Sequence, residues 1–200
     1  MAVVAVYCAS STSIDAAHVA LATEVGTELA RRGHDLVSGG GRVSMMGAVA
    51  AAARAGGSRT IGVIPEALSS REVADFDSDE LIITSGMRER KAAMDERADA
   101  FLGLPGGIGT LEEMFEVWTS RSLGMHTKPV VLLDPVSFYA GLLDWLGSLG
   151  RSGFVRPEAL ALLVVVPTVA AAFDAIERGP RHPTRIEAGP SAPLRVEPTE

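Results

Sequence analysis

The chain of 200 residues is poor in cysteine, histidine and aromatic residues, and each scarcity excludes a class of protein. Cys8 is the only cysteine, so no disulfide can form within the chain, which fits a reducing compartment. The four histidines are scattered, and neither H-E-x-x-H nor C-x-x-C occurs, so we expect no metal site. Aromatic residues make up only 5% of the chain, whereas alanine and glycine are abundant. This composition favours an α/β protein with close helix-to-sheet packing over a β-sandwich.

The charge and the hydrophobic runs exclude two kinds of partner. A formal net charge of −7 argues against a nucleic-acid-binding surface, which requires a basic face. The apolar start, "MAVVAVYCAS", has no basic residue before it and is too short to cross a bilayer. We therefore expect a cytoplasmic protein that binds neither nucleic acid nor membranes.

Strand and helix patterns alternate along the chain. β-Branched apolar runs predict strands buried on both faces, and Asp15 and Gly33 are expected to begin and end the first helix. Strands are expected over residues 3–7, 34–41, 59–65, 81–85, 100–107, 128–134 and 161–167. Helices are expected over residues 16–33, 45–57, 87–98, from 110 onward, 136–153 and 168–179, with an exposed loop over 66–80.

This alternation predicts a doubly wound parallel sheet of about seven strands with helices on both faces. Residues 1–179 are expected to form one domain. The remaining residues, 180–200, contain five prolines and scattered charges, which predicts a disordered tail.

Two glycine turns, at residues 39–41 and 106–109, each follow a strand. Because the carboxyl ends of parallel strands share one edge, we expect both turns at a single ligand site. Neither turn has the G-x-G-x-x-G spacing of a dinucleotide site or the G-x-x-x-x-G-K-[ST] spacing of a triphosphate site. For the turn at 39–41, ligand binding and close packing are equally good explanations.

The stretch "PGGIGTLEE" (residues 105–113) is more informative. Its glycines let the backbone approach an anion, and Thr110 can cap the following helix, so free N–H groups would bind one phosphate without a lysine. The alternative is an ordinary capped helix in which Glu112 and Glu113 complement the dipole. That alternative leaves the three glycines unexplained.

Two carboxylates on this helix suggest glycosidic chemistry. Glu113 and Glu116 are three residues apart and lie on one helix face. Beside a sugar anchored by its phosphate, they would stabilise an oxocarbenium-like transition state and deprotonate the attacking water. For Glu116 a solvated surface acid is an equally good interpretation.

The preceding helix, "MRERKAAMDER" (residues 87–97), begins at the same sheet edge. Arg90 is its cation of interest, because a guanidinium can bind phosphate or donate to a departing purine. For Arg88, Asp95 and Arg97 we favour solvent-exposed i,i+4 pairing.

Taken together, "MRERKAAM", "PGGIGTLEE" and "LGMHTKPVVLLD" resemble the LONELY GUY family of cytokinin riboside 5′-monophosphate phosphoribohydrolases. Residues 105–113 match the family's P-G-G-x-G-T-x-x-E pattern throughout, and Arg90 and Lys91 match its R-K pair. The segments "VYCASS" and "SGGGRVSMMGAVA" are also similar, so that the resemblance spans about residues 2–178.

The resemblance implies a Rossmann-like fold, a homodimer or an assembly of dimers, and no metal or organic cofactor. It implies hydrolysis of cytokinin riboside 5′-monophosphates and AMP to free base and ribose 5-phosphate, with Arg90 and Glu113 as the catalytic pair. The residues implied to contact the substrate are Glu72, Met87, Lys91, Gly106, Gly107, Ile108, Gly109, Thr110, Leu111, Glu112, Glu116 and Thr119.

The chain departs from the family pattern at Ala9 and Ser44, where glycine is usual, and at Arg88, where histidine is usual. These positions border the site, so they bear on base preference more than on the reaction. The alternatives are a general purine nucleotide 5′-monophosphate nucleosidase and a nucleotide-binding sensor without turnover. A pyridoxal-phosphate decarboxylase is disfavoured, because Lys91 and Lys128 are the only lysines.

Overall fold

The computed structural model describes residues 1–69 and 74–179. Two predictions fall outside these residues: the substrate contact of Glu72 and the disordered tail over 180–200.

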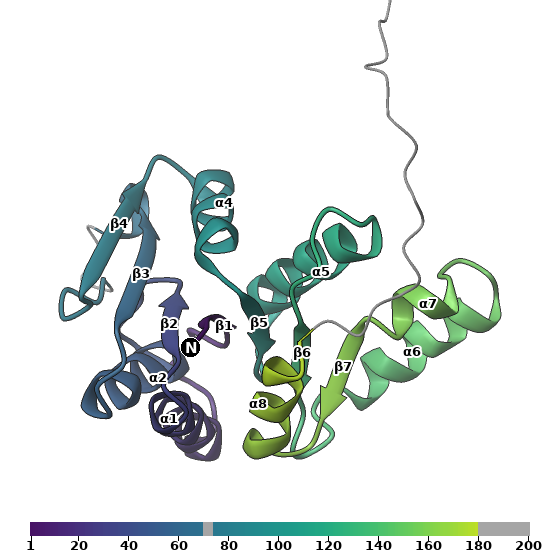
Figure 1. The fold of residues 1–200 in the computed structure, drawn as a ribbon, viewed down its shortest axis with the longest axis horizontal. Coiled ribbons are helices and arrows are strands. Elements are labelled where there is room, and N and C mark those ends of the chain that lie inside the picture. The colour runs from purple at the N-terminus through teal and green to yellow at the C-terminus, as the bar shows by residue number, and fades with distance from the viewer. Residues whose placement is uncertain (70–73, 180–200) are drawn as a thin grey trace, which may run out of the picture.

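Seven strands form one parallel sheet in the order β4-β3-β2-β1-β5-β6-β7 (Figure 1). The strands are β1 (Val3–Tyr7), β2 (Asp35–Ser38), β3 (Thr60–Pro65), β4 (Glu80–Thr84), β5 (Ala100–Gly103), β6 (Val130–Leu133) and β7 (Leu163–Val166). The α/β class, the parallel sheet and its seven strands are therefore confirmed. The direction of winding reverses between β1 and β5, where ligands of such sheets bind.

The helices cover both faces of the sheet. They are α1 (Ala16–Arg31), α2 (Ser44–Ala55), α3 (Glu66–Leu68), α4 (Met87–Arg97), α5 (Ile108–Ser122), α6 (Ala140–Arg151), α7 (Pro157–Leu160) and α8 (Val169–Glu177). Figure 1 shows α1, α2 and α8 on one face and α4, α5, α6 and α7 on the other.

The alternating faces of β1 explain its continuous apolar run. Val4 and Val6 are fully buried against the layer of α1, α2 and α8, whereas Ala5 and Tyr7 pack beneath α4 and α5. A central strand covered on both sides needs apolar residues at every position. The small residues allow close contact elsewhere: a Cβ on Gly26 in α1 would lie 2.3 Å from the Val49 carbonyl oxygen of α2.

The ends of the first helix are as predicted. The Asp15 carboxylate accepts from the Ala17 N–H at 2.8 Å, and Gly33 follows the helix with a φ of 71°, a conformation that favours glycine.

Other boundaries differ from the prediction. The helix expected from residue 136 begins at Ala140, because the Asp134 carboxylate accepts from the N–H groups of Phe138 and Tyr139 and holds these residues in a turn. The short helices α3 and α7 were not predicted, and α3 lies within the expected loop 66–80. Among the described residues, no helix is both long and apolar enough to cross a membrane.

Candidate active site

The glycine-rich loop after β5 leads into α5, and the start of this helix has no side-chain cap. The N-cap of α5 is Gly107, which makes no side-chain capping bond, and the helix begins at Ile108. The prediction that Thr110 caps a helix starting near residue 110 is therefore wrong. Thr110 is buried in the first turn, where a Cβ on Gly106 would lie 2.1 Å from its Oγ1. Thr110 packs against Gly106, so a residue with a Cβ would not fit at position 106.

The start of α5 is suited to an anion. The first N–H groups of a helix have no intrahelical partner, and within the described part of the chain no side-chain cap substitutes for one. At Gly107 and Gly109 an added Cβ would point into open space, so the backbone is accessible from outside. Free N–H groups and the positive end of the helix dipole together favour a phosphate.

Tyr139 holds this loop from below. Its hydroxyl donates to the Leu104 carbonyl oxygen at 2.8 Å. The ring is almost fully buried, and burial raises the pKa of Tyr139 to about 12, so the hydroxyl stays protonated. No sequence motif singled out this residue, which lies 35 positions from its partner.

Arg90 and Glu113, the two predicted catalytic residues, are in direct contact. Arg90 Nη1 donates to Glu113 Oε1 at 2.6 Å, and Arg90 Nε donates to the Val63 carbonyl oxygen at 3.0 Å. Both residues are only 8% exposed. They come from α4 and α5, which start at the same edge of the sheet, so the fold joins residues that are 23 positions apart.

Glu113 is subject to opposing electrostatic effects. Burial raises the pKa of its carboxyl group, whereas the adjacent Arg90 charge lowers it, and burial has the larger effect. Burial also raises the pKa of Tyr7 and Cys8 at the end of β1, and the Glu113 charge acts on both in the same direction. Glu113 therefore faces the carboxyl end of β1, at the point where the strand order reverses.

The turn at residues 39–41 packs against Arg90. A Cβ on Gly39 would lie 1.9 Å from Arg90 Nη2, so a larger residue there would displace the guanidinium from its present position. The next residue, Gly40, has a φ of 69°, which also favours glycine. Close packing therefore explains the glycine at position 39, and the residue that packs against it is Arg90.

Lys91 occupies a second charged cluster beside the first. Its Nζ contacts Glu112, and it lies 2.8 Å from Glu116 Oε2. Glu113 and Glu116 both face α4, as their spacing predicted, but they pair with different cations. The side chain of Glu116 is half exposed, so it is a paired surface acid in this structure.

The remaining predicted residues lie around this centre at different depths. Met87 and Ile108 begin α4 and α5 and are exposed, whereas Leu111 is partly buried. Thr119 is exposed further along α5, and no hydrogen bond among the described residues joins its side chain to Arg90 or Glu113. The described residues contain no group of three acidic, histidine or cysteine side chains that could hold a metal ion.

Ser44 marks a departure from the family pattern. Its φ is 54°, a left-handed conformation uncommon outside glycine, and its hydroxyl donates to the Ser11 carbonyl oxygen at 2.5 Å. This bond joins the start of α2 to the loop that follows β1.

The fold and the site define a class: an α/β protein that presents free helix N–H groups beside a buried carboxylate–guanidinium pair at the switch point of its sheet.

Comparisons with known proteins agree. A family profile described as "Possible lysine decarboxylase" matches residues 46–176. A cytokinin riboside 5′-monophosphate phosphoribohydrolase from Mycobacterium tuberculosis is 54% identical over 86% of this chain and 91% of its own. A rice relative with the same activity in its name, LOG, is 45% identical over 82% of this chain and 68% of its own. The chain therefore belongs to the family of cytokinin riboside 5′-monophosphate phosphoribohydrolases.

Solved structures confirm the Rossmann-like fold. The Moco carrier protein from Chlamydomonas reinhardtii matches with a TM-score of 0.66 and 22% identity, over 88% of this chain and 95% of that chain. The molybdenum cofactor binding protein from Rippkaea orientalis matches with a TM-score of 0.68 and 19% identity over the same shares. At these identities the likeness concerns the fold alone.

Proposed function

We propose that this protein is a phosphoribohydrolase that cleaves the N-glycosidic bond of cytokinin riboside 5′-monophosphates and AMP. The products are the free base and ribose 5-phosphate. The observation that carries the proposal is the buried contact of Arg90 with Glu113 next to the uncapped start of α5. Membership of the phosphoribohydrolase family supports it.

The 5′-phosphate would bind at the start of α5. The N–H groups of the loop over Gly106–Thr110 supply positive potential, and Lys91 adds a cation once it leaves Glu112 or Glu116. A single phosphate suits this site better than a triphosphate, because three carboxylates of α5 lie close by.

Glu113 would act at the anomeric carbon. As the base departs with the bonding electrons, positive charge develops at C1′, and a buried carboxylate stabilises it strongly because little water screens the interaction. The water oxygen then bonds to C1′ and its proton passes to Glu113. Glu113 gives up this proton to solvent while the departed base nitrogen takes one up from solvent, so that one water is consumed and the carboxylate is restored. Arg90 favours the ionised form of Glu113 against the effect of burial, and it donates a hydrogen bond to the leaving base, since a guanidinium retains its own protons.

Apolar side chains at the site entrance would contact the base and its substituent. Met87 is 47% exposed and Ile108 is 88% exposed, and each is the first residue of a helix at this edge. Exposed apolar residues in such a position suit a prenylated adenine, with Leu111 behind them. Glu72 and Thr119 would complete the substrate contacts.

We also propose that the protein forms a homodimer or an assembly of dimers in the cytoplasm. An apolar groove between α5 and α6 supports the association, because several of its residues remain partly exposed. The groove is lined by Leu111, Met114, Phe115, Trp118, Leu132, Leu142, Leu143, Leu146 and Leu163.

Amino-acid decarboxylation, the activity in the family profile's description, is disfavoured by the positions of both lysines. Lys128 Nζ donates to the backbone oxygen of Asp95 at 2.6 Å and to its carboxylate at 2.9 Å. The contacts of Lys91 with Glu112 and Glu116 raise its pKa, whereas a Schiff-base lysine requires a lowered one.

The test is product formation from AMP and from isopentenyladenosine monophosphate, measured as free base by chromatography. We expect base release from both, faster from the prenylated nucleotide if Met87 and Ile108 contact the substituent. Binding of either nucleotide without any release of base would refute the proposal and indicate a nucleotide-binding sensor.

A further inference from the structure

A second cationic site lies at the opposite edge of the sheet from Arg90 and Glu113. The helices α5 and α8 begin at the carboxyl edge of the strands and run back to the amino edge, where Arg121 and Arg178 lie near their ends. A small hollow opens between them, beside the start of β6 and β7. Its apolar wall consists of Pro129, Ala161, Val164 and Ala175.

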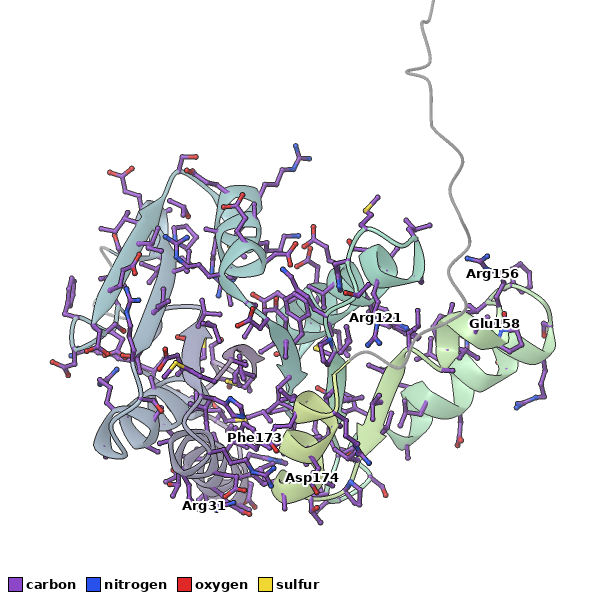
Figure 2. All side chains as sticks on the ribbon, in the orientation of Figure 1. Arg31, Arg121, Arg156, Glu158, Phe173 and Asp174 are labelled. Carbon is purple, nitrogen blue, oxygen red and sulfur yellow. The ribbon has the colours of Figure 1, made fainter. Side chains whose placement is uncertain are left out.

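Arg121 is buried with few partners. It is 6% exposed, and among the described residues its side chain makes one hydrogen bond, from Nη1 to the Leu162 carbonyl oxygen at 3.2 Å. A guanidinium has five N–H donors, so most of those of Arg121 have no partner among the described residues and remain accessible to solvent. Burial lowers the pKa of Arg121. In Figure 2 its side chain lies within the body of the protein near β7.

Other well-covered arginines of the protein have counter-charges. Arg90 pairs with Glu113, and Arg32 pairs with three carboxylates of α1 and α8. Over residues 1–69 and 74–179, by contrast, no carboxylate lies within salt-bridge distance of Arg121 or Arg178. A largely covered cation with no ion pair keeps only part of its hydration, and the Arg121 nitrogens without a protein partner still reach solvent, where an oxyanion could contact them.

The position of Arg121 and Arg178 at helix C-termini does not by itself explain why Arg121 is buried. A helix C-terminus favours a cation, which accounts for an exposed arginine such as Arg178, whose Nε donates to the Asp174 carbonyl oxygen. It does not account for burying a second arginine behind apolar side chains. The guanidinium of Arg121 and the apolar wall together provide a place where an oxyanion would be weakly hydrated and strongly attracted.

We propose that the hollow between Arg121 and Arg178 binds a small oxyanion, a carboxylate or phosphate group. Two sources share this chemistry. One is a free ion such as inorganic phosphate. The other is the protein itself, since Gly179 lines the hollow and the sequence continues beyond it with Glu187, Glu197 and Glu200.

The first experiment measures thermal unfolding of the full-length chain while sodium phosphate replaces sodium chloride at constant ionic strength. The variants are Arg121→Met and Arg178→Met, and Arg156→Met is the matched control. Arg156 is exposed at the outer rim of the protein, so this control removes the same charge far from the hollow (Figure 2). Phosphate binding at the start of α5 is common to all four proteins, so differences between them report the hollow.

We expect phosphate to stabilise the wild type and Arg156→Met more than the two hollow variants, with phosphate affinity at the hollow about tenfold or more lower after Arg121→Met. If Arg121→Met fails to fold, Arg178→Met supplies the same comparison, because the Arg178 side chain is exposed and its replacement leaves the core intact.

The second experiment replaces Glu187, Glu197 and Glu200 with glutamine in the wild type and in Arg121→Met. A lower Tm in the wild-type background alone would show that the chain's own carboxylates bind there. An unchanged Tm with an intact phosphate effect would assign the site to a free ion. Equal phosphate shifts in all four proteins, with no effect of the triple change, would overturn the proposal.

Discussion

Replacing Glu113 with glutamine isolates the charge that the proposed reaction requires. The amide has the same shape, and its oxygen can still accept from Arg90 Nη1, so the two helices remain linked. Two effects on stability oppose each other. A charge-assisted hydrogen bond becomes an ordinary one, which costs about 1–2 kcal/mol of stability. The neutral amide, however, removes the cost of burying a charged carboxylate, the same burial that raises the pKa of Glu113. We therefore expect a folded protein of nearly unchanged Tm.

Turnover should respond far more strongly than stability. Removing one electrostatic contact that acts at a transition state costs about a hundredfold to a thousandfold in kcat, or about 2.7–4 kcal/mol. We expect Glu113→Gln to bind AMP with near-normal affinity and to release adenine at least a hundredfold more slowly, measured by chromatography under saturating substrate.

The neighbouring residue provides the control. Glu112→Gln removes the same charge from the same helix, at a half-exposed side chain that contacts Lys91 instead of Arg90. It should change kcat by no more than a few-fold. If Glu113→Gln retained near-wild-type turnover, or if both variants lost activity equally, Glu113 would not act at C1′ and the mechanism would be wrong.

Three further predictions follow from individual contacts. Gly39→Ala places a Cβ 1.9 Å from Arg90 Nη2, so it should displace the guanidinium and lower kcat strongly in a folded protein; unchanged kinetics would show that the contact is dispensable. Tyr139→Phe removes the hydroxyl bond to Leu104, which should cost about 1 kcal/mol in unfolding free energy and raise the KM for AMP; an unchanged KM would separate the loop anchor from phosphate binding. Burial raises the pKa of Glu113, and the reaction needs its ionised form, so kcat/KM should decrease as the pH is lowered. The midpoint of this decrease should lie above 4.5, the ordinary pKa of glutamate, and a midpoint at or below 4.5 would contradict the assignment.

Features that depend on neighbouring residues were predictable from the sequence. The run Val3–Tyr7 alternates between two buried faces, and a strand with both faces covered must be apolar throughout. Asp15 and Gly33 act at helix ends through bonds to residues a few positions away. Parallel topology predicted that Arg90 and Glu113 lie at one edge of the sheet, because both follow strands on helices that start there, whereas their pairing was implied by the family resemblance.

Contacts between residues distant in sequence could not be predicted in this way. Tyr139 bonds to Leu104 across 35 positions, and its own location depends on a turn that Asp134 imposes before α6. The glycine at position 39 is explained by a guanidinium that arrives from α4. The start of α5 was misplaced because Gly107 caps the helix without a side chain, whereas prediction relied on the hydroxyl of Thr110.

The glycines at and before the start of α5 explain how the proposed phosphate site can be acidic. A lysine in the loop would attract the phosphate, but it would also neutralise a carboxylate placed one turn away. Backbone N–H groups provide positive potential that is fixed at the helix start and falls off within about one turn. Glu113 can therefore lie on the same helix and keep its charge for the sugar, with Arg90 as its sole direct ion-pair partner among the described residues. A buried ion pair of this kind rarely improves stability over apolar packing, so its presence here supports the catalytic role that we propose for it.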